Sequence, residues 1–335
     1  MTSSAELRPG GPAVVALGGG HGLAATLAAV RRYASEVTAV VSVADDGGSS
    51  GRLRQALDIP APGDLRRCLV ALADPAAPWA GFFEHRFGAG ELEGHALGNL
   101  VIAGLASALG DFTAALDEAG RLVGCVGRVL PASTLPVVLQ AQAAGGPVEG
   151  QVKVSEADHI SAVSLLPPDA PAHPAVPAAI ATADQVVLGP GSLFTSVLAA
   201  AIVPEVTRAL ATTPARTVYV CNLAPQRPET DGFDVGDHVS ALAAHGVRPD
   251  VVLCHPGTRG RDTCPVEVVE REVAAPSGLA HDPALLATAL AALAGERADP
   301  RAGRAPGGEG RLRFDPRGAG ASPLAVPHAG RTTPA

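Results

Sequence analysis

Lysine is almost absent from this chain, and its scarcity excludes one large class of nucleotide-binding enzymes. Among 335 residues there is a single lysine, Lys153, which lies between two valines. A Walker A loop needs lysine between a glycine and a serine or threonine, so a P-loop nucleotide hydrolase is excluded. A lysine nucleophile or a Schiff base would have to use this one residue.

Aromatic residues, paired cysteines and long apolar runs are also scarce. One Trp, two Tyr and seven Phe leave Ala, Val and Leu to build the core. The five cysteines include no C-x-x-C pair, which argues against a structural zinc site, and we expect no disulfides. No apolar run reaches the roughly 18 residues of a membrane helix, and the first dozen residues contain no apolar signal core. We therefore expect a cytoplasmic protein without a membrane span.

Basic residues are outnumbered by acidic ones. The chain has 25 Lys and Arg against 33 Asp and Glu, a net charge of −8, and 47% of its residues are apolar. An acidic chain without a basic stripe argues against nucleic-acid binding. The length suffices for a proper core in one large domain or two small ones.

Short β-branched runs alternate with glycine turns and helical patterns. Residues 13–17 form an apolar run that ends in the turn 18–22, and a helical pattern follows as far as about residue 33. Residues 37–43 then predict a strand that is buried on both faces. Later segments predict a helical middle at 64–120, strands near 122–128, 137–142, 160–166, 185–188, 217–221 and 250–254, and a helix at 237–245.

This alternation predicts an α/β fold, with a Rossmann-like, mostly parallel sheet, helices on both faces and a helical middle segment. We expect a flexible leader at residues 1–11 and one α/β nucleotide-binding domain at residues 12–295. Residues 296–335 predict a disordered tail, because apolar periodicity stops there and seven arginines accompany four acids.

The first glycine-rich turn is a candidate anion site. It consists of Gly18, Gly19, Gly20, His21 and Gly22. Backbone amides in such a turn approach a ligand closely, and the following helix adds a partial positive charge. The spacing of Gly20, Gly22 and Ala25 also meets a loose dinucleotide-binding template, so a turn that binds NAD(P) and a turn without a ligand are both alternatives.

An acidic, hydroxyl-rich loop follows the second predicted strand. Its carboxylates could hold ribose hydroxyls or a Mg²⁺ ion, and its hydroxyls, amides and arginine could hold phosphate. A solvated loop that caps the next helix is the alternative. The loop consists of Asp45, Asp46, Gly47, Gly48, Ser49, Ser50, Gly51 and Arg52.

Two helical segments offer further polar side chains. Asp64 is a predicted N-cap, and an anionic neighbour would explain Arg66 and Arg67 in the first turn after it. His95 and Asn99 are four residues apart, which predicts that they share one helical face. Such a pair could contact a base, a sugar or a carboxylate.

A second strand-to-helix turn is predicted on the same edge of a parallel sheet. Ser192 is its predicted helix cap, and Asn222 directly follows the next strand. Two anion-tolerant turns on one edge indicate a ligand with a diphosphate or two charged ends. The turn and its first helical residues include Gly189, Pro190, Gly191, Ser192 and Thr195.

Together these motifs resemble the YvcK, or gluconeogenesis factor, family, which is related to the CofD 2-phospho-L-lactate transferases. The resemblance covers about residues 12–260 and implies a bacterial, cytoplasmic, Rossmann-like protein. It also implies binding of a UDP-sugar, notably UDP-N-acetylglucosamine, and support of cell shape and wall synthesis on gluconeogenic carbon sources. The matching motifs are GGGHG at 18–22, DDGGSSGRLR at 45–54, PGDLR at 62–66, GHALGNL at 94–100, GPGSLFTS at 189–196 and CN at 221–222.

The resemblance also implies an arrangement of the ligand. Gly19, Gly20 and Gly22 would line the nucleotide phosphates, and Asp45 and Asp46 would lie at the ligand or metal edge. Asn99 and the turn 189–192 would contact the opposite end of the ligand.

Three functions stay open at this point. The first is a UDP-sugar-binding regulator of cell shape that requires no cofactor and does not turn over its ligand. The second is a 2-phospho-L-lactate transferase-like enzyme, in which Asp45 or Asp46 holds Mg²⁺ and Arg52 or Arg66 stabilises the developing charge, with Asp64 as a further catalytic candidate. The third is an NAD(P)-binding protein. Expected partners are the UDP-sugar, cell-wall or morphogenesis proteins and a second copy in a homodimer, with no nucleic acid and no membrane span.

Overall fold

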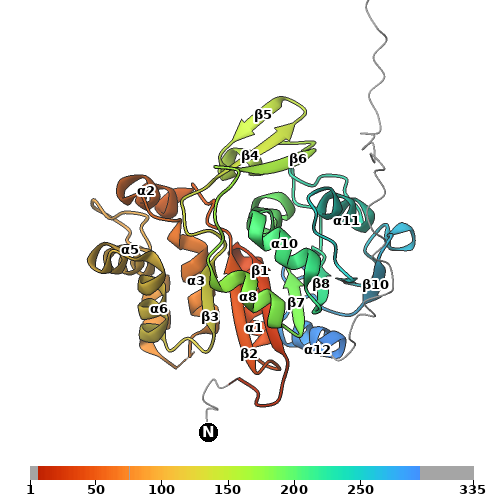
Figure 1. Ribbon diagram of the computed structural model, residues 1–335, viewed down its shortest axis with the longest axis horizontal. Coiled ribbons are helices and arrows are strands. Elements are labelled where there is room, and N and C mark those ends of the chain that lie inside the picture. Colours follow the sequence, from red (N-terminus) through yellow and green to blue (C-terminus); the bar gives the residue numbers. More distant parts are fainter. Residues whose placement is uncertain (1–6, 75, 295–335) are drawn as a thin grey trace, which may run out of the picture. The chain divides into compact units, whose positions relative to one another are not determined.

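A seven-stranded parallel sheet forms the centre of the computed structural model, which describes residues 7–74 and 76–294 (Figure 1). The strand order is β10-β9-β8-β7-β1-β2-β3, and every neighbouring pair is parallel. The strands are β1 (Ala13–Gly18), β2 (Glu36–Val41), β3 (Arg128–Pro131), β7 (Gln185–Leu188), β8 (Arg216–Val220), β9 (Val251–Cys254) and β10 (Glu267–Glu270).

This strand order confirms the predicted Rossmann-like sheet. The chain builds outward from β1 through β2 to β3, then returns to the other side of β1 with β7 and continues to β10. The boundary between β1 and β7 is therefore a topological switch point, where the loops after the two strands diverge. Open α/β sheets bind their ligands in the crevice at the carboxyl ends of the strands at such a point.

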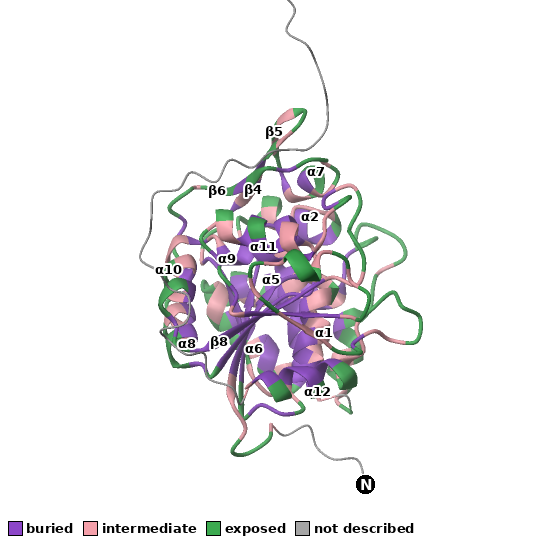
Figure 2. Cartoon of the chain, turned by 90° about the vertical axis from the view of Figure 1, so that its right-hand side faces the viewer, coloured by how far each residue is buried: buried purple, intermediate pink, exposed green. Residues whose placement is uncertain are grey.

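Helices cover both faces of the sheet (Figure 2). Helix α1 packs against α3 and α12 on one face, and α8 packs against α10 on the other. The helical middle segment is confirmed as α3 to α6. The helices are α1 (Gly20–Val30), α2 (Gly48–Leu57), α3 (Pro62–Leu72), α4 (Pro78–Glu84), α5 (Leu97–Leu109), α6 (Phe112–Val123), α7 (Gln151–Ser155), α8 (Ala175–Thr182), the π-helix η1 (Leu193–Leu198), α9 (Ala199–Ala201), α10 (Pro204–Thr212), α11 (Val235–Ala244), the 3-10 helix η2 (Arg261–Thr263) and α12 (Pro283–Ala294).

A small antiparallel sheet, ordered β5-β4-β6, stands apart from the main sheet. Two of its strands, β4 (Val138–Ala143) and β6 (Ala162–Leu166), match predicted strands. The third, β5 (Gly146–Glu149), was not predicted, because half of its residues are exposed and it has no apolar run. The strand expected near 122–128 was misplaced: α6 extends to Val123, and β3 begins only at Arg128.

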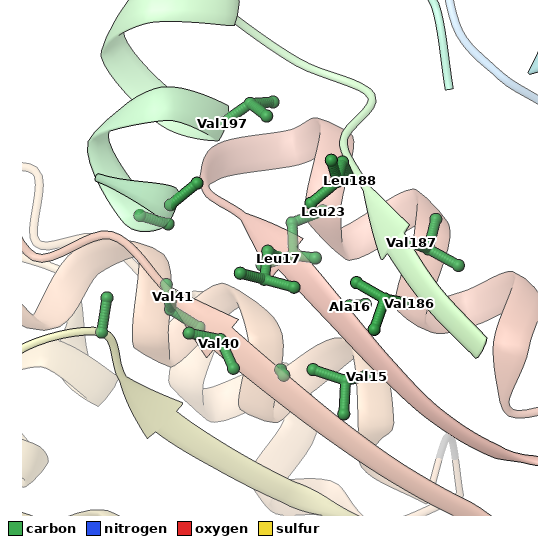
Figure 3. Packing of buried hydrophobic residues seen from close by; sticks show 14 of the residues in the cluster. Val15, Ala16, Leu17, Leu23, Val40, Val41, Val186, Val187, Leu188 and Val197 are labelled. Atoms are coloured by element: carbon green, nitrogen blue, oxygen red, sulfur yellow. The ribbon is translucent and has the colours of Figure 1, made fainter. Parts of the chain in front are cut away.

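Part of the hydrophobic core lies beneath the turns that follow β1 and β7. Figure 3 shows Leu17 of β1, Leu23 of α1, Leu188 of β7 and Val197 of η1 gathered in one apolar cluster. All four side chains are fully buried. Burial of one such side chain stabilises the fold by about 1.5–3 kcal/mol. The turns after β1 and β7 are therefore packed on stabilising apolar contacts.

The two predicted ends fall mostly outside the described residues. Part of the expected leader is held in place, because the amide of Arg8 donates to the carbonyl of Ala34 at 2.7 Å. Residues 1–6 and the predicted tail lie outside the described part of the chain. Within the described part, no single helix has both the length and the apolar character needed to span a membrane.

Candidate functional site

The two glycine turns pack directly against each other at the switch point. A Cβ atom on Gly22 would lie 2.1 Å from the carbonyl oxygen of Pro190, so only glycine allows this approach. The hydroxyl of Thr26 in α1 donates to the carbonyl of Gly189 at 2.6 Å and ties the turns together. The sequence prediction that both turns share one edge is therefore correct.

An internal carboxylate occupies part of the first turn. Asp64 accepts a hydrogen bond from the amide of Gly20 at 2.7 Å and one from Arg67 at 2.6 Å. The prediction that Asp64 is an N-cap was wrong, because α3 begins at Pro62 and its cap position is Ala61. The amides of His21 and Gly22, next along the turn, have no acceptor among the described residues and remain available to a ligand.

Asp45 faces Asp64 across the edge. Its carboxylate accepts from the amide of Gly47 at 3.0 Å and is hydrogen-bonded to Ser50. Burial raises the pKa of the Asp45 carboxyl, and the charge of Asp64 raises it further. Two carboxylates in one half-buried place form a site that favours a cation or a shared proton.

Asp46 points away from this pair. Its carboxylate accepts from the amide of Val152 at 3.0 Å, at the start of α7. A Cβ atom on Gly150 would lie 2.5 Å from the same carboxylate, so the approach of α7 is close. The adjacent acids therefore separate, and the partner of Asp45 is Asp64 rather than Asp46.

Three polar side chains meet between α2 and α5. The hydroxyl of Ser49 lies 3.0 Å from Nδ1 of His95, and Nδ2 of Asn99 donates to the same hydroxyl at 3.0 Å. His95 precedes α5 instead of sharing a helical face with Asn99, yet both side chains converge as expected. Burial lowers the pKa of His95, and the charge of Arg52 lowers it further. The Oδ1 atom of Asn99 is buried without a hydrogen-bond partner, which leaves it free to accept from a ligand or water.

The two candidate arginines lie in different surroundings. Arg52 is exposed on α2 and donates to the carbonyl of Glu93 at 2.8 Å. Arg66 is only 2% exposed and donates to the carbonyl of Phe83 at 3.2 Å, with Glu84 2.5 Å away. Burial lowers the pKa of the Arg66 guanidinium. Arg66 therefore joins α3 to α4, whereas Arg52 joins α2 to the loop before α5 and keeps an exposed side chain.

The second turn is fixed by the residue that follows β8. The side-chain oxygen of Asn222 accepts from the amide of Gly191 at 2.9 Å, and its nitrogen donates to the carbonyl of Gly191 at 2.9 Å. Ser192 caps η1, as predicted, by accepting from the amide of Thr195 at 3.2 Å. Asn222 thus positions the turn, which explains why an amide side chain follows this strand.

A buried glutamate that the sequence did not reveal lies under the second turn. Glu229 accepts from the amide of Phe194 at 2.7 Å and from the hydroxyl of Ser192 at 2.6 Å. It comes from the loop between β8 and α11 and is 4% exposed. The only feature of the sequence that could have indicated Glu229 is its position in the loop after β8, a strand that ends at this edge.

Beside the second turn is a hollow of about 210 Å³. Residues after β8, after β9 and at the start of α11 line it, among them Asn222, Phe233, Asp234 and Arg259. An aromatic ring, an amide and a guanidinium are groups that recognise a polar ring such as a base or a sugar.

Divalent-metal binding has limited support in this geometry. Across residues 7–74 and 76–294, no group of three or more His, Cys, Asp or Glu residues is arranged to hold a metal ion. Mg²⁺ in nucleotide sites, however, usually takes one or two carboxylates together with substrate phosphates. Asp45 and Asp64 fit that donor set, and Arg67 already pairs with Asp64 at 2.6 Å.

Comparison with known proteins finds one family model and several relatives. The family model of the 2-phospho-L-lactate transferase CofD matches residues 14–276. A relative from Mycobacterium tuberculosis (strain CDC 1551 / Oshkosh) is 45% identical over 303 residues, which are 83% of this chain and 89% of the relative. The protein named "Gluconeogenesis factor" from Bacillus subtilis (strain 168) is 41% identical over 237 residues, covering 70% of this chain and 75% of that protein.

A solved structure shares the fold. The crystal structure of a member of the upf0052 family from Bacillus halodurans superposes with a TM-score of 0.77 and 37% sequence identity. The match covers 83% of this chain and 97% of that chain.

Proposed function

This chain belongs to the CofD family, and from that membership we propose that it is a cytoplasmic UDP-sugar-binding regulator of the gluconeogenesis factor type. The observation that supports the proposal best is the contact between the two glycine turns at the switch point between β1 and β7, with Asp45 of the loop after β2 facing Asp64 beside the first turn. A nucleotide-sugar is a ligand with a charged middle and two polar ends, and this edge offers groups for all three parts.

The phosphates of the ligand would take the donors that the protein leaves open. These are the amides of His21 and Gly22 at the start of α1, and the N–H groups of Arg52 other than the one that donates to the Glu93 carbonyl. An amide at a helix N-terminus and a charge-assisted contact both favour phosphate. Asn99, whose Oδ1 has no partner, and the hollow beside Asn222 would serve the uncharged parts of the ligand.

Isothermal titration calorimetry with UDP-N-acetylglucosamine tests this proposal. We expect a dissociation constant below about 1 mM for UDP-N-acetylglucosamine and no comparable heat from free N-acetylglucosamine. The variant Arg52→Gln should bind at least about tenfold more weakly, because a hydrogen bond to a charged group is lost. Its control is Arg54→Gln on the same helix, which should bind like the wild type. Absence of heat at millimolar UDP-N-acetylglucosamine would exclude this ligand, and competition by NAD would favour the dinucleotide alternative.

A second candidate function rests on the Asp45–Asp64 pair. We propose as the alternative a 2-phospho-L-lactate transferase-like activity, in which the two carboxylates hold Mg²⁺ against the phosphates of a nucleotide-activated donor. The ion would supply positive charge to the departing nucleotide. Asp45 and Asp64 would orient it, and Arg52 would steady the transferred group. Mg²⁺-dependent transfer to a deazaflavin acceptor, lost in Asp45→Asn, would favour this function; no transfer with any nucleotide donor would exclude it.

The regulatory role also implies partners. We propose that the bound UDP-sugar changes the affinity of this protein for cell-wall or morphogenesis proteins, and that the chain forms a homodimer. Native mass spectrometry with and without UDP-N-acetylglucosamine tests the oligomeric state. Recovery of the protein in the membrane fraction after cell lysis would contradict the cytoplasmic location.

A further inference from the structure

Four donors converge on the carboxylate of Glu229. The amides of Phe194 and Thr195 lie 2.7 Å and 3.4 Å from its Oε1 atom. The hydroxyl of Ser192 donates at 2.6 Å, and that of Thr195 donates at 3.3 Å. Hydrogen bonds from these donors favour the ionised carboxylate, whereas burial is the larger effect and raises the pKa of Glu229 above its usual value.

No cation balances this charge within the described part of the chain. Glu229 forms no ion pair among residues 7–74 and 76–294, and its neighbours under the turn are amides and hydroxyls. The donors with which a phosphate could be held are thus already used by a carboxylate of the protein itself. The carboxyl of Glu229 contacts Ser192, which directly follows Gly191, the hydrogen-bond partner of Asn222.

The turn after β1 differs in this respect. There Asp64 takes only the amide of Gly20, and the amides of His21 and Gly22 stay open. Asp64 is also paired with Arg67. The two turns look equivalent in the sequence, but two amides of the first stay open to a ligand, whereas the amides of Phe194 and Thr195 in the second already face Glu229.

We propose that Glu229 is a specificity-determining residue, which makes the turn after β7 a site for an uncharged, hydroxyl-bearing group and excludes an anionic one. The inference rests on the proposed function and deepens it. The diphosphate of the ligand lies toward the first turn, and the sugar at its outer end lies against the second. A nucleotide-sugar with a neutral sugar is accepted, and one with a carboxylate on that sugar is rejected.

Two ligands that differ only in the outer charge test this inference on the wild-type protein. UDP-glucose and UDP-glucuronic acid share the nucleotide and the ring, but the second has a carboxylate at C6. We expect UDP-glucose to bind at least about tenfold more tightly, because its C6 hydroxyl avoids the contact between two like charges. Equal affinities would overturn the inference, and so would tighter binding of UDP-glucuronic acid.

The variant Glu229→Gln assigns the discrimination to this residue. Glutamine keeps the shape and an acceptor oxygen but removes the charge, so the affinity ratio should fall to within about threefold. Asp231→Asn is the matched control, since it removes an exposed carboxylate two residues away and should keep the wild-type ratio. A purely structural role of Glu229 would weaken both ligands equally and leave the ratio unchanged, which would overturn the inference.

These experiments distinguish a failure of the proposed UDP-sugar binding from a failure of the inference about Glu229. If the wild type binds neither UDP-sugar, the proposed function fails and the inference fails with it. If the wild type binds both equally, or if Glu229→Gln keeps the ratio, only the inference fails. Should Glu229→Gln not fold, the wild-type comparison of the two ligands still decides.

Discussion

Asp64 accepts a hydrogen bond from the amide of Gly20 at 2.7 Å, although the two residues are 44 positions apart in the chain. The contact places a protein carboxylate in the turn where the sequence suggested a ligand phosphate. It also brings the charge of Asp64 close enough to Asp45 to raise the pKa of that carboxyl. Tertiary structure therefore sets how many donors and how much negative charge the first turn offers to a ligand.

The pKa of Asp45 should respond to a change at Asp64. Burial is the larger cause of the raised pKa and the charge of Asp64 is the second, so Asp64→Asn should lower the pKa of Asp45 without returning it to the ordinary value. A titration of the side-chain carboxyls by carbon-13 NMR measures the shift. An unchanged or higher pKa of Asp45 in Asp64→Asn would show that the two carboxyls do not interact.

Mg²⁺ should act through Asp45 and not through its neighbour Asp46. We expect Mg²⁺ to tighten binding of UDP-N-acetylglucosamine, and Asp45→Asn to remove that gain, because a ligand carboxylate is lost. Asp46→Asn should keep the gain, since Asp46 is hydrogen-bonded to Val152 at the start of α7. Calorimetry with Mg²⁺ and with a chelator measures both variants. If Asp46→Asn loses the gain and Asp45→Asn keeps it, the assignment of the pair is wrong.

Buried His238 should make the stability depend on pH. Its Nδ1 atom lies 2.8 Å from the Tyr219 hydroxyl, and burial lowers its pKa from 6.5 to about 4. Between these values the unfolded chain binds the proton more tightly than the folded protein does. The contribution of His238 to the free energy of unfolding is therefore complete above pH 6.5. As the pH decreases toward 4, this contribution should be lost, which lowers the free energy of unfolding by about 3 kcal/mol.

Urea denaturation between pH 7 and pH 4 checks this prediction. His238→Gln cannot titrate, so its free energy of unfolding should fall less over the same pH range than that of the wild type. His281, whose pKa burial also lowers to about 4, would supply part of the remaining slope. The same pH dependence in His238→Gln and in the wild type would contradict the prediction.

Two glycine-to-alanine substitutions in helices should have opposite effects. Gly22→Ala would place its Cβ 2.1 Å from the Pro190 carbonyl oxygen, which should cost about 2–4 kcal/mol and separate the two turns. Gly104→Ala in α5 meets no atom within 4 Å. It should gain about 0.5–1 kcal/mol, because alanine is the better helix former. Thermal unfolding measures both, and equal effects would mean that the turns do not touch.

The sequence by itself determined the parallel sheet and the position of its turns. Buried parallel strands need continuous apolar runs, and the loops after them need glycine, so 13–17, 37–43 and 185–188 were recognisable without any partner. The same local reasoning placed the turns 18–22 and 189–192 on one edge, because parallel strands end on one side. Ser192 was recognisable as a cap, because capping depends only on the next few residues.

Only the tertiary structure decided which carboxylate meets which donor. Asp46 and Asp45 are adjacent in sequence, yet one turns to α7 and the other to Asp64. Glu229 reaches Ser192 across 37 positions, and nothing in its own segment signals that contact. Strand and helix patterns follow from short-range sterics and burial, whereas side-chain partners follow from the packing of distant elements. The polarity of the edge is therefore a property of the folded chain, even though its glycine turns can be read from the sequence.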